Sequence, residues 1–171
     1  MRKSNFILIL LLFTAFSRGF SQQLNQKVID EKKHYEILIG QCDREGFAGC
    51  NFDSAYKAGY LYAPDKAIID QITPYIKDIN ITLVMGTWCG DSKEHVPHFY
   101  KILDLLKFDF SKLSLICVDR LKTAPGLDLS DLKIERVPTF IFFRKNKEVG
   151  RITETPEASL EKDMLRIISG N

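Results

Sequence analysis

Hydrophobic positions in the second half of the chain change repeatedly between two periodicities, which predicts alternating strands and helices. Continuous apolar runs over residues 80–86 and 112–120 indicate two buried strands. Residues 92–108 between them carry apolar side chains at helical spacing, and residues 127–136 are expected to form a short helix or loop. A strand–helix–strand unit requires a parallel, right-handed crossover, so the sheet contains a parallel pair.

The end of the chain adds antiparallel strands to this unit. Residues 139–153 predict a β-hairpin that turns at residues 145–147, and residues 155–170 predict a helix with Thr155 as N-cap and Pro156 in its first turn. Its apolar positions, expected to face inward, are Leu160, Met164, Ile167 and Ile168. The fold class predicted is α/β, a mixed central sheet flanked by helices on both faces.

The preceding part of the chain favours helices. Residues 22–40 are expected to form a helix that stops at Gly40, and residues 64–78 a second helix. A loop with a short helix connects them. The helical spacing of the first segment rests on Leu24, Val28, Tyr35 and Leu38. We therefore expect an N-terminal helical extension over 22–78 and a main domain over 79–171.

The first residues have the pattern of a secretory signal. Basic residues come first, followed by an apolar run over 6–16, with Gly19 and Ser21 at positions −3 and −1 of a cut before Gln22. The run is about half of the ~20 residues that span a bilayer, so no stable membrane anchor is expected. We expect residues 1–21 to be a signal peptide and the protein to be periplasmic or secreted.

Composition describes an ordinary globular protein. Of 171 residues, 45% are hydrophobic and 27% charged, and the net charge is +2. Loss of residues 1–21 removes three basic residues and no acidic one, leaving 21 Lys and Arg against 22 Asp and Glu. Nothing in this balance predicts a nucleic-acid partner. The four cysteines allow three fully paired connectivities, between which the sequence does not choose.

One cysteine occupies a reactive position. In "GTWCGDS", Cys89 follows a predicted strand and precedes a predicted helix, where free backbone N–H groups and the positive end of the helix dipole stabilise a thiolate. Ser92 lies one helical turn further on. Its hydroxyl can donate a hydrogen bond to the thiolate but cannot form a disulfide, so Cys89 can make a mixed disulfide that Ser92 cannot resolve.

Several motifs together resemble the thioredoxin-like superfamily. They are "TWCGDS", the helix residue Pro97, "RVPTFIFF" over 136–143 and "KEVGRI" over 147–152. The resemblance covers residues 79–169 and implies a thioredoxin fold. It also implies a cis peptide bond between Val137 and Pro138, which would place the Val137 backbone beside Cys89 as the edge that pairs with an extended substrate. Trp88 would shield the thiol and receive substrate, although simple packing is the alternative.

Three positions depart from the pattern of the family. The resolving cysteine is replaced by Ser92, the buried acid before the motif falls on Leu83, and the lysine that often accompanies that acid falls on Leu115. The resemblance therefore implies an apolar interior and places efficient disulfide reduction in doubt.

The remaining cysteines and the histidines have simpler interpretations. Cys42 and Cys50 are expected to form a structural disulfide, with resolution of Cys89 by one of them, or unpaired thiols, as alternatives. Cys117 lies in an apolar strand and is expected to be a buried core thiol. His95 and His98 are expected on the helix surface near the site. No Cys and His pair has zinc-finger spacing, so neither a metal nor another cofactor is expected.

The leading hypothesis is an exported monomer that carries out thiol–disulfide exchange through Cys89 alone, with Ser92 as its hydroxyl partner. Trp88, Val137 and Pro138 would bind the substrate, and the partners would be protein thiols and disulfides or small-molecule thiols. The alternative is a non-catalytic module that keeps the thioredoxin fold and binds polypeptide in the same groove. A peroxide-reactive cysteine is a third interpretation, which the motif does not favour.

Overall fold

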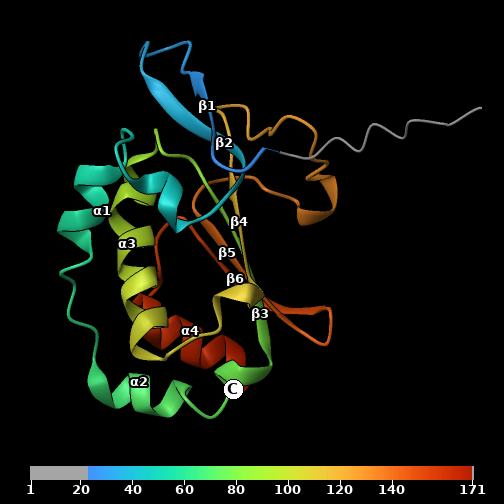
Figure 1. Cartoon of the computed structure of the whole chain (residues 1–171). Helices are drawn as coiled ribbons and strands as arrows, with labels where there is room; N and C mark the ends of the chain where they lie inside the picture. The colour runs from blue at the N-terminus through green and yellow to red at the C-terminus, as the bar shows by residue number, and fades with distance from the viewer. Residues whose placement is uncertain (1–22, 171) are drawn as a thin grey trace, which may run out of the picture.

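A six-stranded mixed sheet organises residues 23–170, which are the residues described by the computed structural model (Figure 1). The strand order is β1-β2-β4-β3-β5-β6; β3 and β4 are parallel, and every other neighbouring pair is antiparallel. The strands are β1 Gln26–Ile29, β2 Glu36–Cys42, β3 Ile79–Met85, β4 Leu113–Cys117, β5 Thr139–Arg144 and β6 Lys147–Thr153. The predicted signal peptide, 1–21, lies outside the described residues.

The same residues contain four α-helices, α1 Asp53–Gly59, α2 Lys66–Ile72, α3 Gly90–Leu105 and α4 Leu160–Ser169. Short 3₁₀ helices occur at η1 Arg44–Phe47, η2 Ile76–Asp78, η3 Phe110–Lys112 and η4 Ser130–Leu132. No helix in this part of the chain is long and apolar enough to span a bilayer.

The elements predicted over the second half of the chain are confirmed. β3, α3, β4 and the β5–β6 hairpin all lie where the periodicity placed them. The hairpin turns through Lys145 and Asn146, whose φ angles are 50° and 61°. Two consecutive left-handed residues are typical of the type I′ turn, whose twist matches that of the flanking strands.

The helix predicted over 22–40 is wrong, because this segment forms the β1–β2 hairpin. Asn25 and His34 have left-handed φ angles of 59° and 57°, which interrupt a helix at both places. β2 pairs with β4, with Gly40 opposite Cys117, so it belongs to the central sheet. The N-terminal extension is therefore helical only from η1 onward.

The final helix begins later than predicted. Ser159, not Thr155, is the N-cap of α4, and its hydroxyl accepts a hydrogen bond from the backbone N–H of Lys162 at 3.4 Å. Glu154 has a left-handed φ of 58°, and Pro156 lies before the helix, outside any regular element. The apolar positions expected to face inward, listed in the sequence analysis, are all buried.

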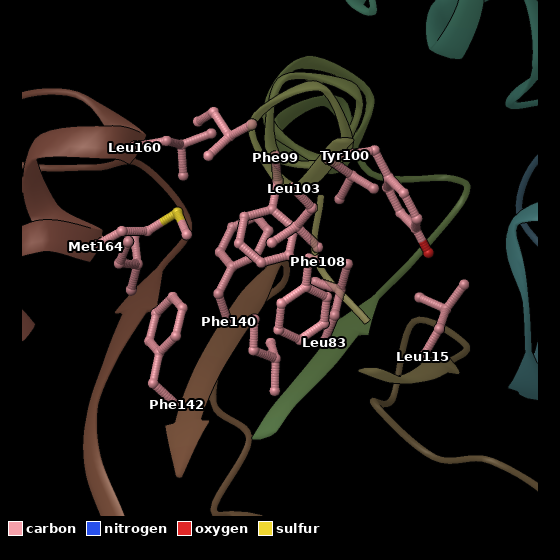
Figure 2. Close-up of a cluster of buried hydrophobic side chains, with 14 of the residues drawn as sticks. Leu83, Phe99, Tyr100, Leu103, Phe108, Leu115, Phe140, Phe142, Leu160 and Met164 are labelled. Atoms are coloured by element: carbon pink, nitrogen blue, oxygen red, sulfur yellow. The ribbon is translucent and has the colours of Figure 1, made fainter. Parts of the chain in front are cut away.

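The main hydrophobic core lies between one face of the sheet and all four α-helices. Figure 2 shows Phe99 of α3 above Phe140 of β5, and Met164 of α4 beside them. The ring centres of the two phenylalanines are 4.6 Å apart. Burial of each such side chain contributes about 1.5–3 kcal/mol to folding. The core therefore fixes α3, and with it the helix N-terminus that carries Cys89.

The sequence predicts helices on both faces of the sheet, but a loop segment covers the opposite face. A smaller apolar cluster of Val84, Ile116, Val118 and Val137 lies there. The segment 119–135, which contains only η4 as a helical element, packs against it through Leu127, Leu129, Leu132 and Ile134. A loop rather than an α-helix thus borders Cys89 on this face.

Candidate active site

Cys89 lies at the junction between β3 and α3, as the sequence predicts. It is the N-cap of α3, with φ −85° and ψ 135°. Its N–H donates to the Gly86 carbonyl at 2.9 Å, and its own carbonyl accepts from the Lys93 N–H at 3.1 Å, the first bond of the helix. The half-buried thiol is therefore close to the unpaired N–H groups of the first helical turn.

The Cys89 thiol donates a hydrogen bond to the carbonyl oxygen of Val137, with Sγ 3.1 Å from that oxygen. The Val137–Pro138 peptide bond is cis, and both residues are buried. Just after this bond, the Thr139 hydroxyl donates to the Arg136 carbonyl at 2.7 Å. The fold thus brings together residues 48 positions apart, and the backbone preceding β5 borders the thiol.

An acidic side chain also approaches the sulfur. Asp91 Oδ2 lies 4.0 Å from the Cys89 Sγ. Asp91 is in the first turn of α3, where a carboxylate interacts favourably with the helix dipole. A thiolate formed at Cys89 thus has a negative neighbour as well as the helix N-terminus.

Ser92 is buried in the first turn of α3 and does not act as expected from the sequence. Its hydroxyl oxygen accepts a hydrogen bond from the backbone N–H of Gly86 at 3.4 Å. The hydroxyl thus ties the loop after β3 to the helix rather than bonding to the Cys89 thiol. Ser92 occupies the position of the resolving residue in the motif, but its hydroxyl makes a structural hydrogen bond to Gly86.

Trp88 lies next to Cys89 and is held by residues that follow β4. Its indole N–H donates to the carbonyl of Val118 at 2.9 Å, and the guanidinium carbon of Arg120 lies 4.7 Å from its ring centre. Gly86 also packs tightly against the indole, because a β-carbon at Gly86 would be 2.6 Å from ring atoms. The indole is half-buried and oriented by three neighbours.

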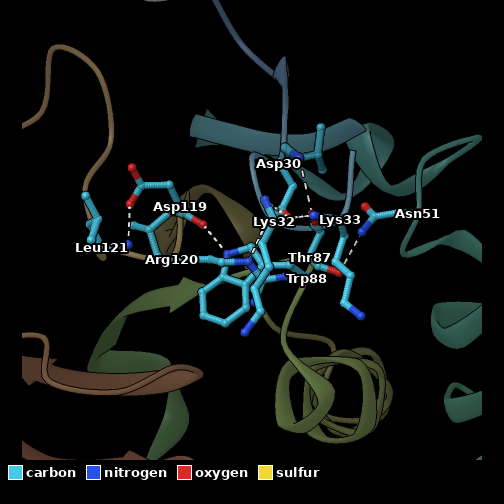
Figure 3. Close-up of polar contacts among 11 residues, drawn as sticks. Asp30, Lys32, Lys33, Asn51, Thr87, Trp88, Asp119, Arg120 and Leu121 are labelled. Atoms are coloured by element: carbon cyan, nitrogen blue, oxygen red, sulfur yellow. Dashed lines mark hydrogen bonds and ion pairs between the residues drawn. The ribbon is translucent and has the colours of Figure 1, made fainter. Parts of the chain in front are cut away.

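Residues of the N-terminal segment hold the loop that precedes the cysteine. Thr87 is buried; its hydroxyl accepts from the Leu38 N–H at 3.2 Å, and its carbonyl accepts from the Asn51 amide at 2.9 Å (Figure 3). Together with Asp30 and Arg120, these residues were missed by sequence reasoning. Their spacing from the motif carries no signal, since they lie on separate segments that meet at this loop only in the folded chain.

The interior behind the site is apolar, in agreement with the departures seen in the sequence. Leu83 of β3 pairs in register with Leu115 of β4, and both side chains are buried. These are the positions where the family resemblance placed an acid and a lysine. The main core therefore has no carboxylate at the position where the family resemblance placed a proton-moving acid.

The expected disulfide between Cys42 and Cys50 is wrong in this structure, because all four cysteines are free thiols. The Cys50 thiol donates to the Phe47 carbonyl at 3.2 Å. Cys42 of β2 instead lies opposite Leu115, which makes it the diagonal neighbour of Cys117 of β4, the buried core thiol expected. A hydrogen bond between these two thiols lowers the pKa of Cys42 and, together with burial, raises the pKa of Cys117 well above its usual value.

The surface position expected for His95 is wrong. His95 is buried, whereas His98 is half-buried and stacks on Tyr62, with ring centres 4.2 Å apart and planes at 19°. Burial lowers the pKa of His98, and the charge of His95 lowers it further. Within residues 23–170, no group of three or more His, Cys, Asp or Glu side chains is arranged to hold a metal ion.

A curated thioredoxin matches part of this chain. The chain is 31% identical over 79 residues to "Thioredoxin O, mitochondrial" of Oryza sativa subsp. japonica, an alignment that covers 46% of this chain and 43% of that one. The chain thus spans less than half the length of this curated relative. No family model matches it.

A solved structure shows a similar fold at low sequence identity. A protein of unknown function from Pseudomonas aeruginosa superposes with a TM-score of 0.58 and 17% identity, over 77% of this chain and 93% of the other. Thioredoxin O2 of Arabidopsis thaliana, in its oxidised state, gives a TM-score of 0.40 and 16% identity, over 62% of this chain and 91% of its own.

Proposed function

From the resemblance of its motifs to the thioredoxin-like superfamily, we propose that this chain carries out thiol–disulfide exchange through Cys89 as its single reactive cysteine. One observation carries the proposal. The Cys89 thiol is half-buried at the N-terminus of α3 and 3.1 Å from the backbone oxygen of Val137. An extended segment that pairs with the Val137 edge would present its sulfur to this thiol.

The reaction that fits this site has two exchanges. The Cys89 thiolate attacks one sulfur of a substrate disulfide, which forms a Cys89–substrate disulfide and releases the other substrate sulfur as a thiolate. A second thiolate, from a protein or a small-molecule thiol, then attacks the mixed disulfide. It bonds to the substrate sulfur and returns Cys89 to its thiolate form. The second thiol is external because Ser92 has no sulfur.

The proposal is tested by trapping partners on the cysteine. Cys89→Ser is expected to abolish disulfide-linked adducts between this protein and thiol or disulfide peptides, as seen on non-reducing gels and by mass spectrometry. Cys117→Ser is the matched control, because its thiol is buried and should leave the adducts unchanged. Equal adduct formation by the Cys89→Ser variant would overturn the assignment.

The apolar interior favours a second candidate, a thioredoxin-fold module that binds polypeptide without exchange. Leu83 and Leu115 lie where the family resemblance placed a proton-moving acid and its lysine. This candidate predicts that Cys89→Ser binds the same reduced peptides with unchanged affinity and that the parent protein forms no adduct.

We also propose that the protein is exported and acts as a monomer on protein or small-molecule thiols and disulfides. Support comes from the signal-like sequence over 1–21. Cell fractionation, with N-terminal sequencing of the recovered protein, tests it: a mature chain beginning at Gln22 is expected. An uncleaved chain in the cytoplasm would contradict the proposal.

A further inference from the structure

We propose that Asp30, acting through Arg120, is a positioning residue for Trp88, so that the β1–β2 hairpin forms part of the active site. This inference rests on the proposed function, in which the indole of Trp88 is part of the substrate-binding surface. It deepens that function, since a fixed aromatic wall beside Cys89 favours polypeptide disulfides over small ones. Contacts connect Asp30 to Arg120 and Arg120 to Trp88 (Figure 3).

Asp30 is a buried carboxylate immediately after β1, only 3% exposed. Its Oδ2 accepts a hydrogen bond from Arg120 Nε at 2.7 Å, and its Oδ1 accepts from the backbone N–H groups of Lys33 and Lys32 at 2.7 and 3.1 Å. Burial alone raises the pKa of Asp30, but these hydrogen bonds hold it below the usual value. The group is therefore a fully paired anion at neutral pH.

Arg120 connects this anion to the active site. Its guanidinium carbon lies 4.7 Å from the centre of the Trp88 ring, while its Nε bonds to Asp30. A guanidinium is planar, so a carboxylate that fixes its Nε edge also fixes the plane that it presents to an aromatic ring. The pair links residues 90 positions apart, and the hairpin thereby reaches the residue adjacent to Cys89.

Trp88 is held from its other sides by the main chain. The indole N–H bonds to the Val118 carbonyl, and Gly86 leaves no space for the ring to move towards β3. Arg120 covers the ring, so loss of its orientation frees the indole in the remaining direction. A buried ion pair is often nearly neutral for stability but can specify one arrangement, which fits a positioning role.

The test compares Asp30→Asn with a matched control in the same hairpin. The amide can still accept from the N–H groups of Lys32 and Lys33 but lacks the charge that orders Arg120. The control is Lys27→Gln, which breaks the more exposed ion pair between Lys27 and Glu36, 3.4 Å apart. Trp88 is the chain's single tryptophan, so its emission spectrum reports its surroundings directly.

We expect Asp30→Asn to shift the Trp88 emission to longer wavelength and to slow the reaction of Cys89 with a disulfide-bonded peptide. The expected loss is about two- to fivefold, the factor that corresponds to one exposed cation–π contact. The rate of reaction with a small aromatic disulfide, 5,5′-dithiobis(2-nitrobenzoate), should stay within about twofold of the parent rate. This small molecule can reach the Cys89 thiol without packing against Trp88. Lys27→Gln should change none of the three readouts.

Unchanged emission and peptide rate in a folded Asp30→Asn variant would overturn the inference and leave the pair with a structural role only. If that variant does not fold, Arg120→Lys replaces it, since it keeps the charge but lacks the planar fork; a shifted emission supports the inference and an unshifted one overturns it. If the unmodified protein reacts with neither disulfide, the proposed function fails, while the emission arm still tests the positioning of Trp88.

Discussion

The hydroxyl of Ser92 accepts a hydrogen bond from the backbone N–H of Gly86, 3.4 Å away, across the loop that carries Cys89. The residue in the resolving position of the motif is therefore buried and engaged with the loop. It nevertheless lies three residues after Cys89, on the first turn of α3, where the two side chains are neighbours. A cysteine at position 92 would therefore lie close enough to Cys89 to form a disulfide with it.

Ser92→Cys is expected to create a reversible disulfide between Cys89 and the new thiol. On oxidation, the variant should lose reaction of Cys89 with iodoacetamide and recover it on reduction, whereas the parent protein keeps a reactive thiol throughout. The weaker hydrogen bond to Gly86 should cost about 1 kcal/mol of unfolding free energy. Persistent alkylation of Cys89 in the oxidised variant would show that the two side chains do not meet.

The contact between Gly86 and Trp88 gives a second prediction. A β-carbon at Gly86 would lie 2.6 Å from ring atoms of Trp88, so Gly86→Ala must displace the indole or the loop. We expect a loss of about 1–3 kcal/mol of unfolding free energy, as for other overpacked sites, and a shift in tryptophan emission. Urea unfolding followed by fluorescence measures both.

Gly90→Ala is the matched control for this substitution, because a β-carbon at Gly90 meets nothing within 4 Å and the residue is the first of α3. Its stability should match or slightly exceed that of the parent protein, since alanine is the better helix former. An equal loss in both variants would mean that the loop tolerates no side chain for reasons unrelated to Trp88.

The pairing of β2 with β4 predicts which cysteines oxidise together. Cys42 lies opposite Leu115, so it is the diagonal neighbour of Cys117 on the same face, and the two thiols are hydrogen-bonded. After refolding under oxidising conditions, peptide mapping should find Cys42 linked to Cys117 rather than to Cys50. Cys50→Ser should leave that product unchanged, and a dominant Cys42–Cys50 peptide would contradict the strand pairing.

Sequence reasoning placed Cys89 at the start of a helix because the signals for that position are local. Cys89 lies between a continuous apolar run and a helical pattern, and both are decided by neighbouring residues. The β1–β2 hairpin was missed because its apolar residues also fit a helical spacing. What determines the hairpin is the partner strand β4, together with left-handed turns at Asn25 and His34, which no short window of sequence reveals.

The contacts that stabilise the loop around Trp88 were not predicted, for the same reason. Asp30, Leu38 and Asn51 reach the loop around Trp88 only in the folded chain, and nothing in their local sequence marks them. The expected Cys42–Cys50 disulfide rested on sequence proximity. Strand register instead places Cys42 beside Cys117.

The stacking of His98 on Tyr62 predicts a pH dependence of stability. Burial and the charge of His95 lower the pKa of His98, and the weaker influences of Glu94 and Glu161 do not reverse the shift. As the pH falls, the unfolded chain therefore binds a proton at this histidine before the folded one does. The stabilisation is complete above the unfolded value of about 6.5 and is lost as the pH falls towards the folded value.

His98→Phe keeps an aromatic ring for Tyr62 but removes the titration, so its unfolding free energy should fall less between about pH 7.5 and pH 5 than that of the parent protein. His34→Gln is the control, because His34 is exposed in the β1–β2 turn and should leave the profile unchanged. Urea unfolding at closely spaced pH values measures the two slopes. Parallel profiles for His98→Phe and the parent protein would place the acid sensitivity elsewhere than at the contact between α3 and Tyr62.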